Sequence, residues 1–169
     1  PSQVGEAYGN PLILLLLGGF ILSTAMEKSG AHRRIALGMV SAFGGRSGRH
    51  LVFGFMAAAA FLSMWISNTA TTLMLLPIVL AVLERVEDNR LKVSLLLGVA
   101  YAASVGGVGT PIGTPPNLIF MEVYQENTGQ EVTFFGWMSW ALPVVAVMIP
   151  LTALWLTRGL APGRAIEMP

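Results

Sequence analysis

The sequence predicts an all-α polytopic membrane protein that contains a re-entrant helical hairpin and a discontinuous transmembrane helix. Hydrophobic residues make up 54% of its 169 positions, charged residues make up 11%, and the mean hydropathy is +0.67, whereas roughly 25% of the residues of soluble domains are charged. Two polar motifs interrupt the apolar runs: Ser67-Asn68-Thr69 and the glycine- and proline-rich stretch 106–116. Irregular backbone at membrane depth is tolerated only where protein or a water-filled cavity satisfies its polar groups. The two breaks therefore indicate a solute-binding site inside the bilayer.

The first transmembrane span is expected within residues 1–30. Its apolar run, Pro11 to Met26, approaches the roughly 20 residues that a membrane helix needs. A signal peptide is the competing interpretation, but here the basic residues Lys28, Arg33 and Arg34 follow the apolar run, whereas a signal peptide carries them before it. Since basic residues favour the cytoplasmic side, we expect the C-terminal end of this span in the cytoplasm.

Residues 31–50 are expected to form a cytoplasmic interfacial helix. The apolar stretch Ile35 to Phe43 is too short to cross the bilayer and has basic residues on both sides. This pattern is typical of an amphipathic helix that lies in the membrane interface. His32 and His50 belong to this segment, and we interpret them as interfacial rather than catalytic residues.

Residues 51–84 are expected to form a re-entrant hairpin with the Ser-Asn-Thr motif at its tip. No charged residue occurs from Leu51 to Leu83, a run that is long for one helix across about 30 Å of hydrocarbon at roughly 1.5 Å per residue. A single tilted helix and a hairpin of two half-helices both fit this length. The hairpin is favoured because both flanks are basic, and only a hairpin returns both flanks to the cytoplasmic side.

The remaining segments are a broken transmembrane helix at 91–124 and a last transmembrane span at 137–158. The connection between them, Gln125 to Gly136, contains no lysine or arginine and is expected outside the cell. With the hairpin in place, this topology puts all ten basic residues on the cytoplasmic side. Trp137 and Trp140 lie near the outer end of the last span and Trp155 near its inner end, as an aromatic belt requires.

The chemistry of the two breaks favours a cation and an anion in one pocket. A half-helix that begins just after Asn68 points its free amide groups toward the midplane, which suits an anionic oxygen. A segment that ends near Ser104 leaves carbonyls without helical partners, and hard cations prefer such oxygen ligands. Ser63 lies one helical turn before Ser67 and adds a hydroxyl on the same face. Neither break contains an acidic residue, so a proton relay is not expected there.

Each motif taken alone also has a purely structural interpretation. Serine and threonine hydroxyls often bond to the carbonyl four residues earlier, asparagine can join helices, and glycine tracts occur where helices pack closely. The Thr-Pro-Pro sequence alone fits a simple kink. An enzyme is not expected, because the chain has no nucleophile and base pair, no metal-binding cluster, no phosphate loop and no cysteine.

With both motifs present, the chain resembles a known family. Ser67-Asn68-Thr69 inside Met64–Thr72, followed by Gly113-Thr114-Pro115-Pro116-Asn117, is similar to the divalent anion:sodium symporter family of sodium-coupled dicarboxylate, citrate and sulfate carriers. The resemblance covers nearly the whole chain, in the order of span, interfacial helix, hairpin, broken helix and returning span. It implies sodium-coupled symport by a multi-pass protein in the cell inner membrane, surrounded by the lipid bilayer.

The resemblance also implies which residues form the site. The implied Na+ ligands are Ser63, Ser67, Asn68, Gly113 and Asn117. Asn68 and Thr69 would contact a carboxylate of the substrate, with Thr114 beside them, and Gly113 would offer its backbone carbonyl. Na+ is then the co-transported ion, and no organic cofactor is expected. The implied partner is a small anionic substrate, either a dicarboxylate, citrate or sulfate, and no nucleic acid.

The family moves its substrate by an elevator-like displacement of a transport domain against a dimerising scaffold, so a homodimer is expected for the full-length protein. Members carry a second, inverted half with its own Ser-Asn-Thr hairpin, which this sequence lacks. We interpret the chain as a fragment with one half-site, one half of an inverted-repeat transporter. Two alternatives stay open: an ion-transporting permease of the arsenite or sodium/proton type, and an inactive membrane scaffold remnant.

Overall fold

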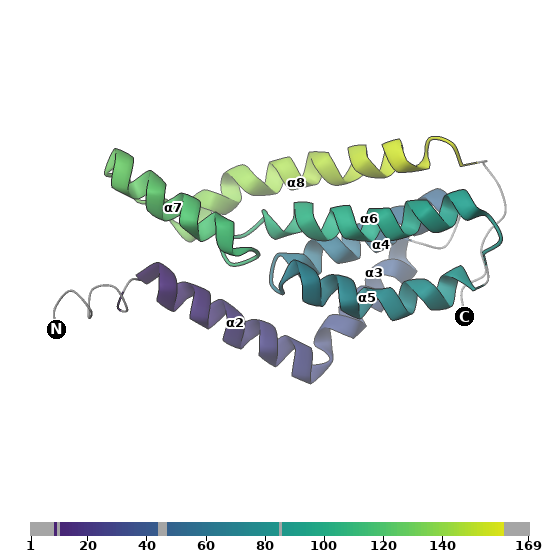
Figure 1. The fold of residues 1–169 in the computed structure, drawn as a ribbon, viewed down its shortest axis with the longest axis horizontal. Helices are drawn as coiled ribbons and strands as arrows, with labels where there is room; N and C mark the ends of the chain where they lie inside the picture. The colour runs from purple at the N-terminus through teal and green to yellow at the C-terminus, as the bar shows by residue number, and fades with distance from the viewer. Residues whose placement is uncertain (1–8, 10, 44–46, 85, 161–169) are drawn as a thin grey trace.

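The computed structural model describes residue 9 and residues 11–43, 47–84 and 86–160, and in these residues all regular secondary structure is helical (Figure 1). The helices are α2 Pro11–Ser29, α3 Ala31–Phe43, α4 Gly48–Ser63, α5 Asn68–Leu83, α6 Asn89–Gly107, α7 Pro115–Thr128 and α8 Phe134–Thr157. The predicted all-α class is therefore confirmed. By length and composition α2 and α8 can each cross a membrane, whereas the apolar helices α4 and α5 are shorter.

Helix α4 forms the centre of the molecule, with α3, α5, α6 and α8 packed around it. Its closest neighbour is α6, which approaches through glycines. A Cβ on Gly98 would lie 3.0 Å from the Met56 side chain, and one on Gly106 would overlap the backbone of Ala60. Small residues at such contacts let two helix backbones come together. The position of α6 against α4 therefore depends on its glycines.

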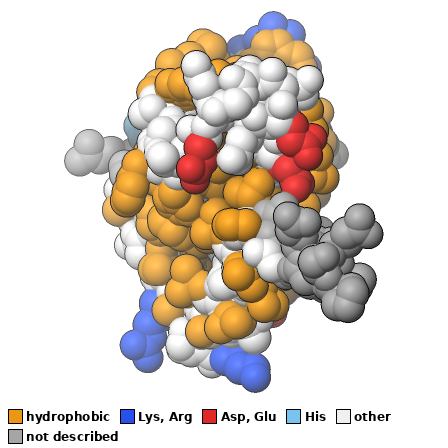
Figure 2. Space-filling model, turned by 90° about the vertical axis from the view of Figure 1, so that its left-hand side faces the viewer, with side chains coloured by type: hydrophobic (Ala, Val, Ile, Leu, Met, Phe, Trp, Pro, Cys, Tyr) orange, Lys and Arg blue, Asp and Glu red, His pale blue; other side chains and the backbone are white. Residues whose placement is uncertain are grey.

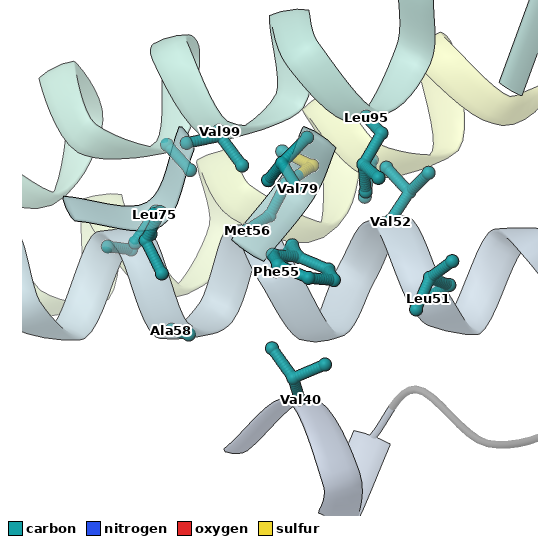
Figure 3. Packing of buried hydrophobic residues seen from close by; sticks show 14 of the residues in the cluster. Val40, Leu51, Val52, Phe55, Met56, Ala58, Leu75, Val79, Leu95 and Val99 are labelled. Atoms are coloured by element: carbon teal, nitrogen blue, oxygen red, sulfur yellow. The ribbon is translucent and has the colours of Figure 1, made fainter. Parts of the chain in front are cut away.

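The apolar core surrounds α4 on two sides (Figure 3). Val40 of α3 lies on one side of α4, and Val79 of α5 and Val99 of α6 lie on the other. Phe55 and Leu75 are completely buried within this cluster. Because the core draws on segments far apart in the chain, it fixes the hairpin and the broken helix relative to each other.

The chain reverses direction between α4 and α5. The start of α4 and the connection from α5 to α6 lie at the same end of the molecule, since a Cβ on Gly48 would lie 3.1 Å from the Leu91 side chain. Arg49 Nη2 also donates a hydrogen bond to the Leu160 carbonyl at 3.2 Å, which brings the end of α8 to this place. This reversal has the shape of a hairpin, and its re-entry into a membrane stays a prediction.

Helix α8 buries one narrow face and leaves the rest exposed. Ala141, Val145, Ile149 and Ala153 follow one another at a spacing of four and are buried. Large apolar side chains elsewhere on this helix, such as Leu154, are exposed. Helix α2 is more exposed still, with Gly19 as its one buried residue. These surfaces are typical of helices that face lipid or another protein segment.

Charge is distributed unevenly along the molecule. Figure 2 shows the end that carries α7, where acidic side chains face the viewer and Lys and Arg side chains appear at the margins. Glu122 and Glu126 belong to α7, while Arg49, Arg90 and Arg158 lie at the opposite end. This distribution is compatible with the expected orientation, in which the basic end faces the cytoplasm.

Several element boundaries differ by a few residues from the sequence interpretation. Helix α6 continues to Gly107 and does not end near Ser104, because glycine is tolerated in a helix and the first proline of this stretch is Pro111. The expected interfacial segment 31–50 contains all of α3 and the first turn of α4, and its residues 44–46 lie outside the described residues.

Candidate functional site

The two breaks in the helices lie side by side at the middle of the molecule (Figure 1). We call residues 64–67, between α4 and α5, the tip, and residues 108–114, between α6 and α7, the broken-helix loop. The hydroxyl of Thr110 in the loop donates a hydrogen bond to the carbonyl of Met64 in the tip at 2.5 Å. Thr110 is completely buried. The two polar motifs of the sequence thus form one structural unit.

Ser63, the last residue of α4, and Asn68, the first residue of α5, form a hydrogen-bonded pair across the tip. Ser63 Oγ donates to Asn68 Oδ1 at 2.5 Å, with Ser63 fully buried and Asn68 half-buried. The Asn68 amide lies against Gly107, where a Cβ would overlap its Oδ1 atom. Gly107 therefore leaves the space that the Asn68 side chain occupies. Sequence reasoning missed Gly107 as a site residue, although the Gly106-Gly107 doublet was a visible signal.

Asn117 connects the broken-helix loop to the end of α6. Its Nδ2 group donates hydrogen bonds to the Gly107 and Thr110 carbonyls, both at 2.8 Å. Gly113 packs so closely on the Gly107 carbonyl that a Cβ there would overlap it. Gly107 thus contacts Asn68 on one side and Gly113 and Asn117 on the other. The predicted sodium ligands Asn68, Gly113 and Asn117 therefore lie together around Gly107, which the sequence did not indicate as a site residue.

Several carbonyls at the end of α6 and in the loop are bonded, where the sequence suggested carbonyls free for a cation. Besides the two that Asn117 engages, the Gly106 carbonyl accepts from the backbone N–H of Gly109 at 2.8 Å. The Val108 carbonyl accepts from Trp137 Nε1, also at 2.8 Å. The sequence assigned Trp137 to an aromatic belt, but its indole N–H also stabilises the loop. The Gly107 and Val108 carbonyls each accept one of these bonds and keep a second lone pair for a cation, whereas the Thr110 carbonyl also accepts from the Gly113 N–H.

Thr69 and Thr114, which are expected to contact substrate beside Asn68, lie at the start of α5 and next to the start of α7. Thr69 is exposed, as is the predicted sodium ligand Ser67, whose hydroxyl accepts a hydrogen bond from the backbone N–H of Ala70 at 3.2 Å. Thr114 is half-buried at the N-cap position of α7 and makes no side-chain cap bond. No hydrogen bond joins Thr69 to Thr114 among the described residues.

A buried hydroxyl without a partner lies one turn beyond the tip. Thr71 is completely buried, and its Oγ1 atom has no hydrogen-bond partner among the described residues. The neighbouring Thr72, by contrast, donates its hydroxyl to the Asn68 carbonyl at 2.8 Å. Buried hydroxyls are nearly always bonded, so Thr71 is unusual. The sequence gave no signal for it, because its environment depends on how α5 packs.

The electrostatics of the site come from dipoles and not from charged side chains. Helix α5 begins at Asn68 and α7 begins at Pro115, so both direct positive N-terminal ends toward this region. Its side-chain donors and acceptors are hydroxyls and amides. Within the described part of the chain, no group of three or more His, Cys, Asp or Glu side chains forms a metal-binding cluster. The arrangement suits an anion at the helix starts and a hard cation among neutral oxygens.

Comparison with known proteins identifies the family. The citrate transporter family matches residues 1–167. The chain belongs to this family. It is also 40% identical over 167 residues to the sodium-dependent dicarboxylate transporter SdcS of Staphylococcus aureus strain NCTC 8325 / PS 47, with the same identity to SdcS of strains COL and Mu50 / ATCC 700699. The match covers 92% of this chain and 32% of each relative.

These findings confirm the resemblance to the divalent anion:sodium symporter family and, with the helical structure, a multi-pass location in the inner membrane. They also agree with the expectation that the chain is not an enzyme, since the family consists of transporters. The chain spans about a third of the length of the curated relatives it matches, 32% in each case.

Proposed function

We propose that this chain is part of a sodium-coupled symporter that carries a divalent anion, such as a C4-dicarboxylate, across the cytoplasmic membrane. The observation that carries the proposal is the meeting of the tip and the broken-helix loop at Gly107. It puts neutral oxygen ligands beside the starts of two helices. The name of the SdcS relative, a sodium-dependent dicarboxylate transporter, supports the same chemistry.

In this proposal the sodium ion binds between the tip and the loop. Its ligands are Ser63, Ser67, Asn68, Gly113 and Asn117, the set implied by the family. The Ser63 hydroxyl donates to Asn68 Oδ1 at 2.5 Å. A cation would bind the same two oxygens through their remaining lone pairs. These ligands are neutral oxygens, the type of donor that a hard cation such as Na+ prefers.

The substrate in this proposal binds at the open side of the same region. Asn68, Thr69 and Thr114 provide an amide and two hydroxyls at the starts of α5 and α7. The positive ends of both helices favour a carboxylate there. Because no acidic side chain neutralises the bound Na+, the dianion would do so. Mutual attraction in a poorly hydrated site makes each ligand improve the affinity for the other, which is the basis of coupling.

The proposal treats the chain as one half-site of an elevator-type transporter. The chain covers 32% of the SdcS length, and inverted repeats build their sites at a shared interface. We infer that a second repeat supplies the other ligands and that the complete protein is a homodimer. The buried, bonded loop and the compact α4–α6 contact support movement of this unit as a rigid body.

Uptake of labelled succinate into proteoliposomes by the complete protein tests this function. We expect uptake with an inward Na+ gradient, no uptake when K+ replaces Na+, and loss of uptake in Asn68→Ala. Asn127→Ala is the matched control, because Asn127 is exposed on α7 and bonds only locally, to the Val123 carbonyl.

Several outcomes would contradict parts of the proposal. Uptake that is indifferent to Na+ would reject the sodium site and favour a permease of another type. Uptake that persists in Asn68→Ala would remove Asn68 from the site. If succinate is not taken up but citrate or sulfate is, the transport class holds and the C4-dicarboxylate assignment fails. No uptake of any of the three would favour a membrane scaffold without transport.

A further inference from the structure

A cavity of about 480 Å³ lies between the start of α6 and the end of α8. It is at the opposite end of α6 from the broken-helix loop and so belongs to neither break. Val93, Trp155 and Leu156 give it apolar walls. Ser94 Oγ donates to the Leu156 carbonyl at 2.9 Å and ties the two helices together there. The cavity is open to the surface and lies along the α6–α8 contact.

Two guanidinium groups line the same cavity. Arg90 Nη1 donates one long hydrogen bond, of 3.4 Å, to the Gly159 carbonyl. The Arg158 guanidinium carbon lies 5.1 Å from the centre of the Trp155 ring. Asp88 uses its carboxylate to cap α6, accepting from the backbone N–H of Arg90 at 2.8 Å. Among the described residues neither guanidinium forms an ion pair, and both line the cavity with N–H groups that can donate to an anion.

The position of the cavity along α8 corresponds to the headgroup region of a bilayer. Helix α8 has 24 residues and is therefore about 36 Å long, somewhat longer than the roughly 30 Å hydrocarbon layer. Arg158 follows its last residue, and the exposed Trp155 precedes it by one turn. From the cavity toward the middle of the membrane, the exposed side chains are apolar, with Leu97 on α6 and Leu151 on α8.

We propose that this cavity binds an anionic phospholipid, with the phosphate held by Arg90 and Arg158 and the upper part of an acyl chain lying on Trp155 and Val93. An anionic headgroup matches the two guanidinium groups, and an acyl chain matches the apolar wall below them. A soluble anion would satisfy only the first of these features. The basic end of the molecule is also the end expected at the cytoplasmic leaflet, where anionic lipids attract arginine and lysine. The site is independent of the proposed transport.

Quenching of tryptophan fluorescence by brominated lipids tests the site. The complete protein is placed in phosphatidylcholine nanodiscs that contain a small fraction of either brominated phosphatidylglycerol or brominated phosphatidylcholine. We expect stronger quenching by the phosphatidylglycerol, and Trp155→Phe should remove this difference. The double variant Arg90→Gln/Arg158→Gln should weaken the preference by roughly 30-fold, about fivefold for each guanidinium group.

The matched control is Arg33→Gln/Arg34→Gln, which removes the same charge from two exposed arginines of α3. This variant should keep the full preference. Equal quenching by the two lipids, or an equal loss in both double variants, would overturn the proposal, because the attraction would then be unspecific. If Arg90→Gln/Arg158→Gln does not fold, Arg90→Lys/Arg158→Lys should keep a reduced preference. Displacement of the lipid by inorganic phosphate alone would also overturn it, since the occupant would be a soluble anion.

Discussion

The tip and the broken-helix loop both interrupt helices at the same depth, but they are built differently. The loop is mostly enclosed: Thr110 and Pro111 are fully buried, although Val108 is exposed. Side chains of Asn117 and Trp137 donate hydrogen bonds to carbonyls of the loop and of the end of α6. In the tip, the Ser67 side chain is exposed, whereas Ile66 is buried. The loop therefore has several carbonyls bonded by side chains of the protein, while the tip leaves the Ser67 side chain accessible to a ligand.

The difference follows from the cost of burying irregular backbone. A carbonyl without a partner away from water costs about as much as a lost hydrogen bond, so a buried loop must be bonded from within. An exposed side chain has no such requirement. We infer that the loop is the rigid frame of the site and that the tip, with Thr69 next to it, is the part that contacts solute. Four substitutions test this division, in order of decreasing effect.

Gly106→Ala should have the largest effect on folding. Its new Cβ would overlap the backbone of Ala60, and a backbone cannot move aside as a side chain can. We expect a loss of about 4 kcal/mol in the free energy of unfolding, in the range where core changes abolish folding. The thermal unfolding midpoint of the purified protein measures it. Gly38→Ala, in open space on α3, should instead stabilise by roughly 0.5–1 kcal/mol. Equal behaviour of the two variants would argue against close packing of α4 on α6.

Asn117→Leu tests whether the loop is held from within. The variant keeps most of the side-chain volume but removes both donors to the Gly107 and Thr110 carbonyls. The Gly107 carbonyl would lose its partner, while the Thr110 carbonyl would keep only the bond from the Gly113 N–H, and the two losses together should cost about 2–3 kcal/mol. Thermal unfolding is again the measurement. Asn127→Leu, on the exposed surface of α7, should change the midpoint little. A neutral Asn117→Leu would mean that the loop does not depend on these bonds.

Ser67→Ala tests the open tip and should separate stability from binding. The Ser67 hydroxyl caps α5, and loss of such a cap costs about 1 kcal/mol. Because Ser67 is also a proposed sodium ligand, the Na+ concentration for half-maximal uptake should rise more than this loss of stability explains. Ser41→Ala, on exposed α3, is the control for the substitution itself. A change in stability without any change in Na+ dependence would limit Ser67 to a capping role.

Thr71→Val should have the smallest effect on folding. Since Thr71 Oγ1 is buried and lacks a partner, a methyl group of the same shape should leave the unfolding free energy unchanged or raise it by up to about 1 kcal/mol. Thr110→Val is the matched comparison, because its hydroxyl is bonded to Met64, and it should destabilise by about 1–2 kcal/mol. If Thr71→Val is the more damaging change, the Thr71 hydroxyl must have a partner in solution, such as water or an ion.

Much of the site was accessible from sequence because its residues lie within two short motifs. Ser67 and Asn68 were expected at the start of a half-helix, and α5 begins at Asn68 after a cap by Ser67. Asn117 and Gly113 were expected near them, and the structure brings both to Gly107. The sodium and substrate roles of these residues stay predictions.

The sequence interpretation of the site was wrong or incomplete where a polar group bonds to a residue far away in the sequence. The sequence suggested free carbonyls at the end of α6, but Trp137 supplies a donor from another helix. It gave no role to Gly107 or Thr110, whose importance depends on contacts with Asn68 and Met64 across the hairpin. Local patterns do not show such contacts, because they report periodicity within a segment and not the segment packed against it.

The sequence by itself determined the class of the protein, the two breaks and the family. Long apolar runs with few charges are stable in the hydrocarbon core of a bilayer, and polar or proline-rich interruptions within them are few enough to identify. Only the tertiary structure decided which polar groups are already bonded and which are left for a ligand. That choice depends on packing: the glycines of α6 set how close α4 comes, and this distance determines which donor reaches each buried carbonyl.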